Sequence, residues 1–387
     1  MIKYIVGSLF IILIVLFIYV KIRYRFWSRQ PVFHIYDILS WIWPKGIIQH
    51  SSPEKTRYYN HRIECSSFDQ ISAGKKDLFY HLIRSHFNNV KNTDYAPSRT
   101  QVLEYFKCHC SIPLISLHFE YFPGLNNINS VNRKLISCSS SRTLSGHLNF
   151  TELKVSYIDF LCVNEKYKDS GIKEIQLYTH YSKVREKGAP PIFLFRESKN
   201  PIVVPLTIFN IYAFHIKNYS NPNFDLPNNI SSHLITTQNL ELLVHYFAEI
   251  KRNFSCFLMP DMSHFKNLVN HSLMIPVLIL DKLEPVGVYF YKYTNTSYVG
   301  DKCIECIGSY HSKNYKQIFL DSYSNTIALL KKKYKFSIIL IENISYNHKL
   351  IKMIMVKDIP KWSESNAYYF YNFAYKPFFS PNVLILN

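Results

Sequence analysis

Acidic residues and cysteines are both scarce in this chain of 387 residues. Only 27 residues are Asp or Glu, against 45 Lys or Arg, which gives a formal net charge of +18. Such a charge suits an anionic partner such as nucleic acid, a membrane surface or a phosphate-bearing cofactor, but it does not select among them. The eight cysteines are too sparse for a disulfide scaffold. Glycine is also scarce, with ten residues, and we attribute this to an AT-rich genome.

Sequence motifs for metal and for nucleic acid are missing as well. "CHC" at 108–110 and "CIEC" at 303–306 each lie in apolar surroundings, and no second cysteine pair of matching spacing lies nearby. We therefore expect no bound metal. Lys and Arg are scattered, with "KKKYK" at 331–335 as the one tight run, so we expect no nucleic-acid partner. A basic nucleic-acid-binding membrane protein is kept as a second alternative function.

The hydrophobic content of 48% allows a large core and predicts two domains, or two halves of one domain. Periodicity indicates two strand–helix–strand units, joined by an Asn- and Pro-rich linker at 218–229. The first unit comprises a strand at 154–163, a helix at 171–188 and a strand at 191–195, and the second comprises a strand at 302–311, a helical stripe from Phe319 to Tyr334 and a strand at 336–341. The same β-α-β arrangement is therefore used twice.

The clearest local signal is an uncharged run from Ile5 to Val20, close to the lower limit of length for a membrane-spanning helix. No small-residue cleavage site follows it, so we read an uncleaved anchor rather than a signal peptide. The downstream flank is the more basic one, which places residues 21–387 in the cytoplasm. The sequence therefore predicts a single-pass protein whose partners include the lipid bilayer, with a host or virion membrane as options.

Three further motifs point to one family. "YRFWSRQPV" (24–32) opens the body, "IDFLCV" (158–163) lies in the first unit, and "YYFYNF" (368–373) precedes an apolar chain end. They resemble the Tyr-x-Phe-Trp-x-x-Gln-Pro-Val, Asn-Phe-Leu-Cys-Val and Tyr-Tyr-x-Tyr-Asn-Trp elements of N-myristoyltransferases (glycylpeptide N-tetradecanoyltransferases). The matches occur in the family's order and extend the resemblance over about residues 22–387. We therefore expect a divergent, membrane-anchored relative, with a viral source as one option.

The resemblance implies an α+β fold of two acetyltransferase-like (GNAT-type) halves, each a mixed β-sheet flanked by helices. With the anchor, the expected division is a transmembrane helix at 1–21, an acyl-CoA-binding half at 22–217 and a peptide-binding half at 218–387. The implied activity is transfer of a myristoyl or other long-chain acyl group from acyl-CoA to the N-terminal glycine amine of a protein. Myristoyl-CoA would be a co-substrate, no cofactor would be bound permanently, and the protein would be a monomer.

The thioester oxygen must be polarised by hydrogen-bond donors. In the resembling enzymes a bulge in the Phe-Leu-Cys-Val strand points two backbone amides at that oxygen, and these amides carry over to Phe160 and Leu161. A backbone role leaves no trace in the side chains. Without the resemblance, the residues alone favour Phe160 and Leu161 being only core residues.

The CoA site is expected directly after this strand, where Lys166 and Lys168 precede a helix N-terminus, whose free amides and dipole favour phosphate. Family members have a more basic loop, and a proline where this chain has Glu174. Phe26 and Trp27 would cover the nucleotide, although a juxtamembrane aromatic belt is the other reading. The resemblance implies cofactor contacts from Tyr24, Phe26, Trp27, Val163, Lys168, Asp169, Ser170, Gly171 and Ile172.

The resemblance is weakest at the peptide site. The family's acidic loop is replaced by residues 87–97, which retain only Asp94, while Tyr212 and Glu364 are the expected substrate-binding residues. These departures favour the main alternative, a catalytically degenerate, membrane-tethered descendant that binds acyl-CoA or protein.

The last expectation concerns the base. An α-amino group has a pKa of roughly 7.7–8.0 and must lose a proton before it can attack a thioester. The resembling enzymes use their C-terminal carboxylate, whose usual pKa is roughly 3.3–3.7 and is raised by burial. The apolar run from Val383 to Leu386 would carry the carboxylate of Asn387 inside. The alternative is that this run is only an edge strand.

Overall fold

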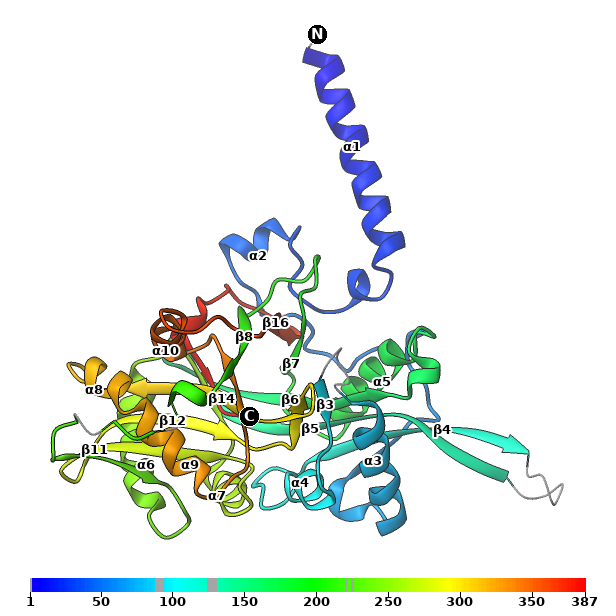
Figure 1. Ribbon diagram of the computed structural model, residues 1–387. Coiled ribbons are helices and arrows are strands. Elements are labelled where there is room, and N and C mark those ends of the chain that lie inside the picture. The colour runs from blue at the N-terminus through cyan, green and yellow to red at the C-terminus, as the bar shows by residue number, and fades with distance from the viewer. Residues whose placement is uncertain (1, 88–92, 124–130, 220, 224–225) are drawn as a thin grey trace.

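The computed structural model describes residues 2–87, 93–123, 131–219, 221–223 and 226–387. Parts of the loop predicted at 87–97 and of the linker predicted at 218–229 lie outside these ranges. A twisted sheet runs through the body with helices packed around it, and one long helix, α1 (Ile2–Arg23), extends away from the body (Figure 1).

The predicted transmembrane anchor at 1–21 is wrong. In the described part of the chain, no helix combines the length and the apolarity needed to cross a membrane. The uncharged run from Ile5 to Val20 is shorter than the roughly 20 apolar residues of a typical spanning helix, and Lys21 and Arg23 occupy the last turn of α1. The predicted single-pass membrane location is corrected by the same finding.

Most strands join one sheet of 16 strands. Its main path runs in the order β18-β10-β5-β6-β7-β16-β8-β15-β14-β12-β11-β9. These strands are β5 (Val131–Leu148), β6 (Thr151–Val163), β7 (Phe193–Ser198), β8 (Thr207–His215), β9 (Ile230–Leu234), β10 (Cys256–Met259), β11 (Ile275–Asp281), β12 (Glu284–Lys292), β14 (Asp301–His311), β15 (Ile338–Glu342), β16 (Trp362–Tyr371) and β18 (Val383–Ile385). Off this path lie β2 (Glu64–Ser67), β3 (Thr93–Tyr95), β4 (Leu114–Pro123) and β13 (Thr296–Tyr298), while β1 (Gly46–Ile47) pairs with β17 (Phe373–Ala374).

Some of the helices begin at a side-chain cap. Ser98 and Gln101 form a capping box at α4 (Arg99–Glu104), and Asp261 caps α7 (Met262–Asn270). The other helices are α2 (Ile38–Ile42), α3 (Ala73–His86), α5 (Ile172–Glu186), α6 (Leu240–Arg252), α8 (Lys316–Asp321), α9 (Tyr323–Lys331) and α10 (Asn347–Met355).

The two predicted β-α-β units are confirmed with one difference. The first is β6, α5 and β7. In the second, the expected single helix is divided into α8 and α9 at Ser322, whose hydroxyl donates a hydrogen bond to the carbonyl of Ile318. A serine that bonds back to the preceding turn is a common cause of such a break.

Strands from both predicted halves alternate in the sheet. β16, from the C-terminal region, lies between β7 and β8, which both come from residues before 218. The domain boundary between residues 217 and 218 stays a prediction. The mixed α/β architecture itself is as expected.

The C-terminus lies in the middle of the molecule (Figure 1). β18 pairs in parallel with β10, and residues 383–386 are fully buried. Gly308 of β14 permits this approach, because a Cβ there would lie 2.5 Å from Cδ1 of Leu384. The absence of a side chain at residue 308 therefore makes room for the chain end.

β6 and β7 are parallel and separate after two residue pairs. They pair at Ser156 with Phe193 and at Tyr157 with Leu194, and each strand then continues on its own, β6 to Val163 and β7 to Ser198. Two parallel strands that diverge leave their inner edges open to a ligand. This divergence positions the candidate site.

Candidate active site

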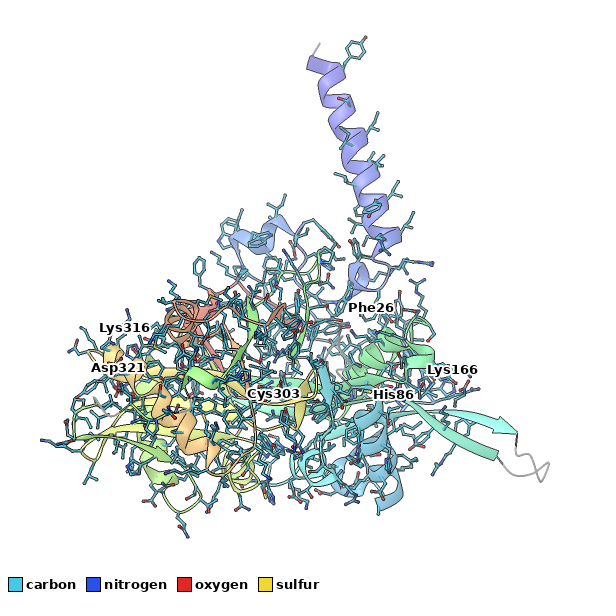
Figure 2. The ribbon with its side chains drawn as sticks, viewed as in Figure 1. Phe26, His86, Lys166, Cys303, Lys316 and Asp321 are labelled. Carbon is cyan, nitrogen blue, oxygen red and sulfur yellow. The ribbon has the colours of Figure 1, made fainter. Side chains whose placement is uncertain are left out.

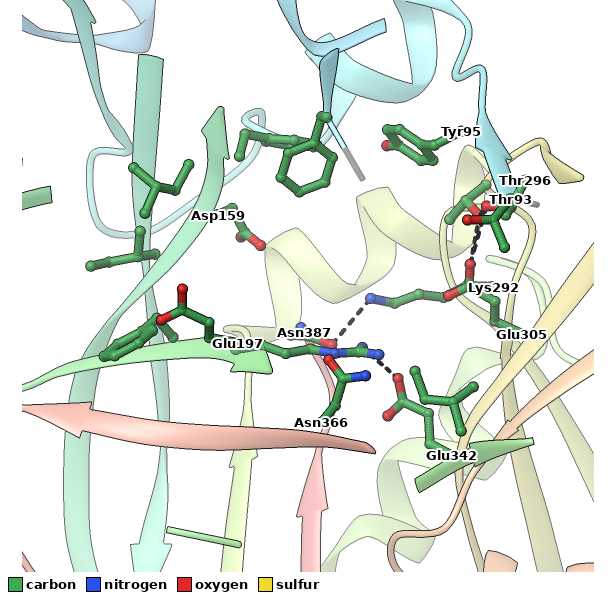
Figure 3. A pocket seen from close by; sticks show the side chains of 18 of the residues that line it. Thr93, Tyr95, Asp159, Glu197, Lys292, Thr296, Glu305, Glu342, Asn366 and Asn387 are labelled. Atoms are coloured by element: carbon green, nitrogen blue, oxygen red, sulfur yellow. Dashed lines mark hydrogen bonds and ion pairs between the residues drawn. The ribbon is translucent and has the colours of Figure 1, made fainter. Parts of the chain in front are cut away.

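A cavity of about 460 Å³ opens where β6 and β7 separate. Its wall is built from both strands, from the start of α5, and from β12, β14, β15 and β16 of the C-terminal region (Figure 3). Polar and charged side chains face it from every side: Tyr157, Asp159, Lys173, Arg196, Glu197, Lys292, Thr294, Thr296, Glu305, Glu342, Glu364, Asn366 and Asn387.

A β-bulge in β6 borders this cavity. Cys162 pairs with Cys138 and Asp159 pairs with Ser140 of β5, so Phe160 and Leu161 together oppose only Ser139. Phe160 has a φ of +47°, which is unusual for a residue other than glycine. A bulge leaves its extra residue outside the hydrogen-bond ladder, which frees a backbone group to face a ligand.

The side chain of Phe160 packs in the core with Phe79, Phe87 and Phe106, while both bulge residues also line the cavity. Packing in the core and facing the cavity are therefore compatible at this bulge. The aromatic side chain is a core element, and the backbone beside it belongs to the cavity wall. The oxyanion role of the two amides stays a prediction.

Asp159, directly before the bulge, is fixed by two partners. Its Oδ2 accepts hydrogen bonds from the hydroxyl of Tyr105 at 2.9 Å and from Nε of the buried Arg142 at 3.1 Å. Burial raises the pKa of Asp159, while the charge of Arg142 opposes that rise. The carboxylate is therefore held in one orientation at the edge of the cavity.

Two ion pairs join other walls. Arg196 of β7 donates to Oε1 of Glu342 of β15 at 2.6 Å, and Lys173 of α5 pairs with Glu197 of β7. Burial raises the pKa of Glu342, and the charge of Arg196 opposes that rise. Glu305 of β14 instead accepts hydrogen bonds from two threonine hydroxyls, those of Thr294 and Thr296.

The chain end reaches the same cavity. Asn387 is 7% exposed, and the amide of Leu386 donates to the carbonyl of Leu258 at 2.9 Å. The side chain of Asn387 joins two walls, because its Nδ2 donates to the hydroxyl of Tyr157 and its Oδ1 accepts from Nζ of Lys292 at 3.1 Å (Figure 3). The burial of the apolar tail is thus confirmed, and the role of its carboxylate stays a prediction.

The predicted CoA loop lies beside one end of the cavity. Lys168, Asp169 and Ser170 are exposed, and Lys166 stands beside them before α5 (Figure 2). Gly171 has a φ of +76° and gives α5 no side-chain cap, so the first amides of the helix are not bonded by a capping side chain. Ile172 begins the helix and the next residue, Lys173, lines the cavity.

The predicted aromatic residues are mostly covered by protein. Phe26 is buried, and Trp27 is half-buried and stacks on Phe195 with ring centroids 5.6 Å apart. Tyr24 packs against the same cluster, as do Leu177 and Phe195, which line the cavity. Val163 ends β6, opposite Ser137 of β5. These residues support the cavity wall, and their contact with a nucleotide stays a prediction.

Of the two predicted substrate residues, Glu364 and Tyr212, one lines the cavity and the other packs in the core. Glu364 lines the cavity. Tyr212 is not part of the described lining, because Ile211 before it faces the cavity and Tyr212 packs against the C-terminal core. Sequence reasoning missed Lys292 and Glu305. Lys292 directly follows an apolar run at 286–291 and Glu305 interrupts one at 303–307, and a charge in such a place is itself a signal.

No family profile and no curated protein matches the sequence. Solved structures of Saccharomyces cerevisiae N-myristoyltransferase, in contrast, are similar to this chain over most of its length. One, with bound myristoyl-CoA, has a TM-score of 0.68 at 10% identity and covers 92% of this chain and 94% of that chain. Another, with bound myristoyl-CoA and inhibitors, has a TM-score of 0.70 at 10% identity, over 92% and 91%. The chain has the N-myristoyltransferase fold.

The resemblance carried by three short motifs is therefore confirmed for the fold. At 10% identity it extends no further than the fold, and the chemistry has to be argued from the cavity. The cysteines of the two motifs considered for zinc differ in burial: Cys108 and Cys110 are exposed, and Cys303 and Cys306 are buried. Figure 2 labels Cys303 within the body of the molecule. Among the described residues, no group of three His, Cys, Asp or Glu could hold a metal ion.

Proposed function

We propose that this protein is an acyl-CoA-dependent N-acyltransferase that moves a long-chain acyl group, such as myristoyl, to the N-terminal glycine amine of a peptide or protein. The observation that carries the proposal is the bulge at Phe160 and Leu161, which opens onto a cavity that also receives the chain end. Similar folds hold myristoyl-CoA.

Acyl-CoA would enter as a co-substrate between β6 and β7. The start of α5 offers its dipole and uncapped amides to the diphosphate, and Lys168 adds a nearby positive charge. The acyl thioester would then lie against the bulge, where the amides of Phe160 and Leu161 donate to the carbonyl oxygen. Donors fixed before the reaction stabilise the oxyanion that forms on that oxygen.

The acceptor amine would approach from the C-terminal side. Glu305 of β14 and Glu364 of β16 line this part of the cavity, and their charges suit an incoming ammonium. The main-chain carboxylate of Asn387 would hold this ammonium and begin its deprotonation. Its burial favours that role, because a carboxylate removed from water binds a proton more readily.

The alternative is an acyl-CoA-binding protein without turnover. The ion pair between Lys173 and Glu197 favours it, because this pair links α5 to β7 beside the gap through which acyl-CoA would reach the bulge. The pair is partly exposed, and such pairs contribute roughly 0–1 kcal/mol. An incoming cofactor could therefore displace it at little cost.

The test is incubation of the purified full chain with myristoyl-CoA and a glycine-initiated peptide, followed by mass spectrometry of the peptide and assay of free CoA thiol. The same peptide with an acetylated N-terminus is the matched control. Acyl transfer to the free peptide alone is the expected result. Binding of acyl-CoA in native mass spectrometry without transfer would support the alternative, and no binding at any chain length would contradict both.

A further inference from the structure

Two side chains of β5 hold the backbone of the bulge in β6. The hydroxyl of Ser140 donates a hydrogen bond to the carbonyl oxygen of Asp159 at 3.0 Å. The thiol of Cys138 donates to the carbonyl oxygen of Phe160 at 3.6 Å, a length that suits the larger sulfur atom. Both donor side chains are fully buried, so these hydrogen bonds are shielded from water. Two successive carbonyls at the bulge are therefore held by side chains of one neighbouring strand.

These two carbonyls belong to the peptide units that contain the proposed oxyanion donors. The unit that begins at the carbonyl of Asp159 ends at the amide of Phe160. The next unit joins the carbonyl of Phe160 to the amide of Leu161. A peptide unit is planar and trans, so its N–H points away from its C=O. A side chain that fixes one of these carbonyls therefore also sets the direction of the amide in the same unit.

The direction agrees with the position of the cavity. In a regular strand, successive carbonyls point to opposite edges, whereas here two in a row are bonded by side chains of β5. The bulge and the positive φ of Phe160 permit this local change. β6 lies between β5 and β7 in the sheet. Two successive amides would then point away from β5, to the side on which β6 and β7 separate and the cavity opens.

We propose that Ser140 and Cys138 are positioning residues of the acyl transfer, which orient the two bulge amides toward the thioester oxygen. This inference rests on the proposed function and adds two residues that act through the amides without touching the substrate. The hydrogen bonds also make the amides stronger donors, because a bond to the carbonyl polarises the whole peptide unit. Neither side chain exchanges a proton with the substrate, so the terminal carboxylate keeps its proposed role.

The thiol of Cys138 must keep its proton to act as a donor. Burial raises its pKa well above the usual value, and the adjacent thiol of Cys162 adds to that rise. Cys162 lies opposite Cys138 across the two strands, but its thiol donates to the carbonyl of Leu82 in α3. The two facing thiols therefore hold different segments, the bulge and α3.

The deciding experiment compares Ser140→Ala and Cys138→Ala in the full chain, with myristoyl-CoA and a glycine-initiated peptide as substrates. Ser140→Ala should lower kcat by about tenfold, which is less than the roughly 100-fold or more that removal of an oxyanion donor itself costs. Cys138→Ala should lower kcat by about threefold, because a thiol is the weaker donor. The KM values for both substrates should stay as in the wild type, since neither residue contacts them.

Conservative variants separate the hydrogen bond from packing. Cys138→Ser and Ser140→Cys each retain a donor and should recover most of the lost kcat. Cys162→Ala removes an equally buried thiol of the same core cluster, and Ser322→Ala removes a buried serine–carbonyl hydrogen bond between α8 and α9. Both of these controls should leave kcat unchanged. Equal kcat values in Ser140→Ala and Ser140→Cys would overturn the inference, because the hydrogen bond would then have no effect.

The carbonyl stretch of the bound thioester gives a readout that needs no turnover. With myristoyl-CoA labelled with ¹³C at the thioester carbon, the band should lie at lower frequency on the wild type than in solution, because the amides polarise the C=O bond. In a Ser140→Ala/Cys138→Ala double variant the band should move back toward its solution frequency. An unchanged band would contradict the inference, even if the variant were a poor catalyst. Thermal melting identifies a double variant that fails to fold, and the two single variants then replace it.

The two levels of proposal fail in different ways. If the wild type transfers nothing, the proposed function fails and this inference fails with it. If the wild type is active and the double variant has the same kcat, only the inference fails.

Discussion

The hydroxyl of Tyr371 donates a hydrogen bond to Oε1 of Gln30, across 341 residues of chain. Both residues are buried, and the amide of Asn372 also donates to the carbonyl of Pro31. The first and the last of the three sequence motifs are therefore in direct contact. The motifs at opposite ends of the chain thus pack against each other beside β7.

Tyr371→Phe should lower the free energy of unfolding by about 1–3 kcal/mol, because it leaves the buried Oε1 of Gln30 without its donor. Tyr375→Phe is the matched control, since the hydroxyl of Tyr375 only accepts from Asn149 at an exposed position. Urea unfolding of both variants measures the difference. Equal free energies of unfolding for the two variants would mean that the buried hydrogen bond does not stabilise the folded state.

Lys168→Glu should weaken binding of myristoyl-CoA by about tenfold, because it reverses a charge beside the start of α5, where the diphosphate is expected. Raising the salt concentration should reduce the difference from wild type. Lys357→Glu changes an equally exposed lysine after α10 and should leave affinity unchanged. Calorimetry with myristoyl-CoA measures both. Equal losses would point to net charge rather than to this loop.

Local patterns predicted local structure well. The helix expected at 171–188 is α5 at Ile172–Glu186, and the strand expected at 336–341 is β15 at Ile338–Glu342, because periodicity and a following Gly188 are properties of a short segment. The exception is the anchor, where an uncharged run was read as long enough to span a membrane. The absence of charge and the basic flanks favoured an anchor, but the run was at the lower limit of length for a spanning helix.

The cavity could not be predicted in the same way. The cavity brings together Lys292 at the end of β12, Glu342 at the end of β15 and Asn387, which follows β18. These residues are far apart in the sequence and meet only in the folded sheet. A charged residue inside an apolar strand signals a special position, but not which residue it faces. The bulge at Phe160 was expected only from the resemblance, since its φ leaves no mark in the sequence.

The stacked pair of His109 and His264 should make stability depend on pH. Their ring centroids are 3.5 Å apart, and burial next to the charge of Arg142 lowers the pKa of His109 to about 4 and that of His264 to about 2. In the unfolded chain both titrate near 6.5, so the unfolded state binds protons first as the pH falls. Stability is therefore fully present above pH 6.5 and is lost progressively below it, by up to about 1.4 kcal/mol per pH unit for each histidine.

His264→Phe should keep the ring contact and remove one of these two titrations. Its unfolding free energy, measured in urea at pH 7, 6 and 5, should fall less steeply with decreasing pH than that of the wild type. His245→Gln alters an exposed histidine of α6 and should leave the slope unchanged. A slope identical in all three proteins would show that the pair does not control acid stability.

The chain end gives the sharpest test of the proposed chemistry. Appending a short Gly-Ser tail after Asn387, or deleting the last three residues, should reduce turnover by at least about 100-fold, because either change displaces a carboxylate from a buried position in the cavity. Binding of myristoyl-CoA, measured by calorimetry, should persist, since the expected cofactor contacts lie at α5 and Trp27. If the extended chain turned over at the wild-type rate, the carboxylate would have no catalytic role and the apolar tail would be only an edge strand.

Asn387→Ala separates the carboxylate from the side chain. From the sequence alone this variant should keep full activity, because the carboxylate belongs to the main chain. The structure changes the expectation, since the Asn387 amide is the hydrogen-bond partner of Lys292 and also donates to Tyr157. We now expect a loss of roughly tenfold in kcat, between no effect and the roughly 100-fold cost of a misplaced catalytic group. Unchanged kcat would mean that these two side-chain contacts do not position the carboxylate, and a loss as large as that of the extended chain would mean that the side chain and the carboxylate act as one unit.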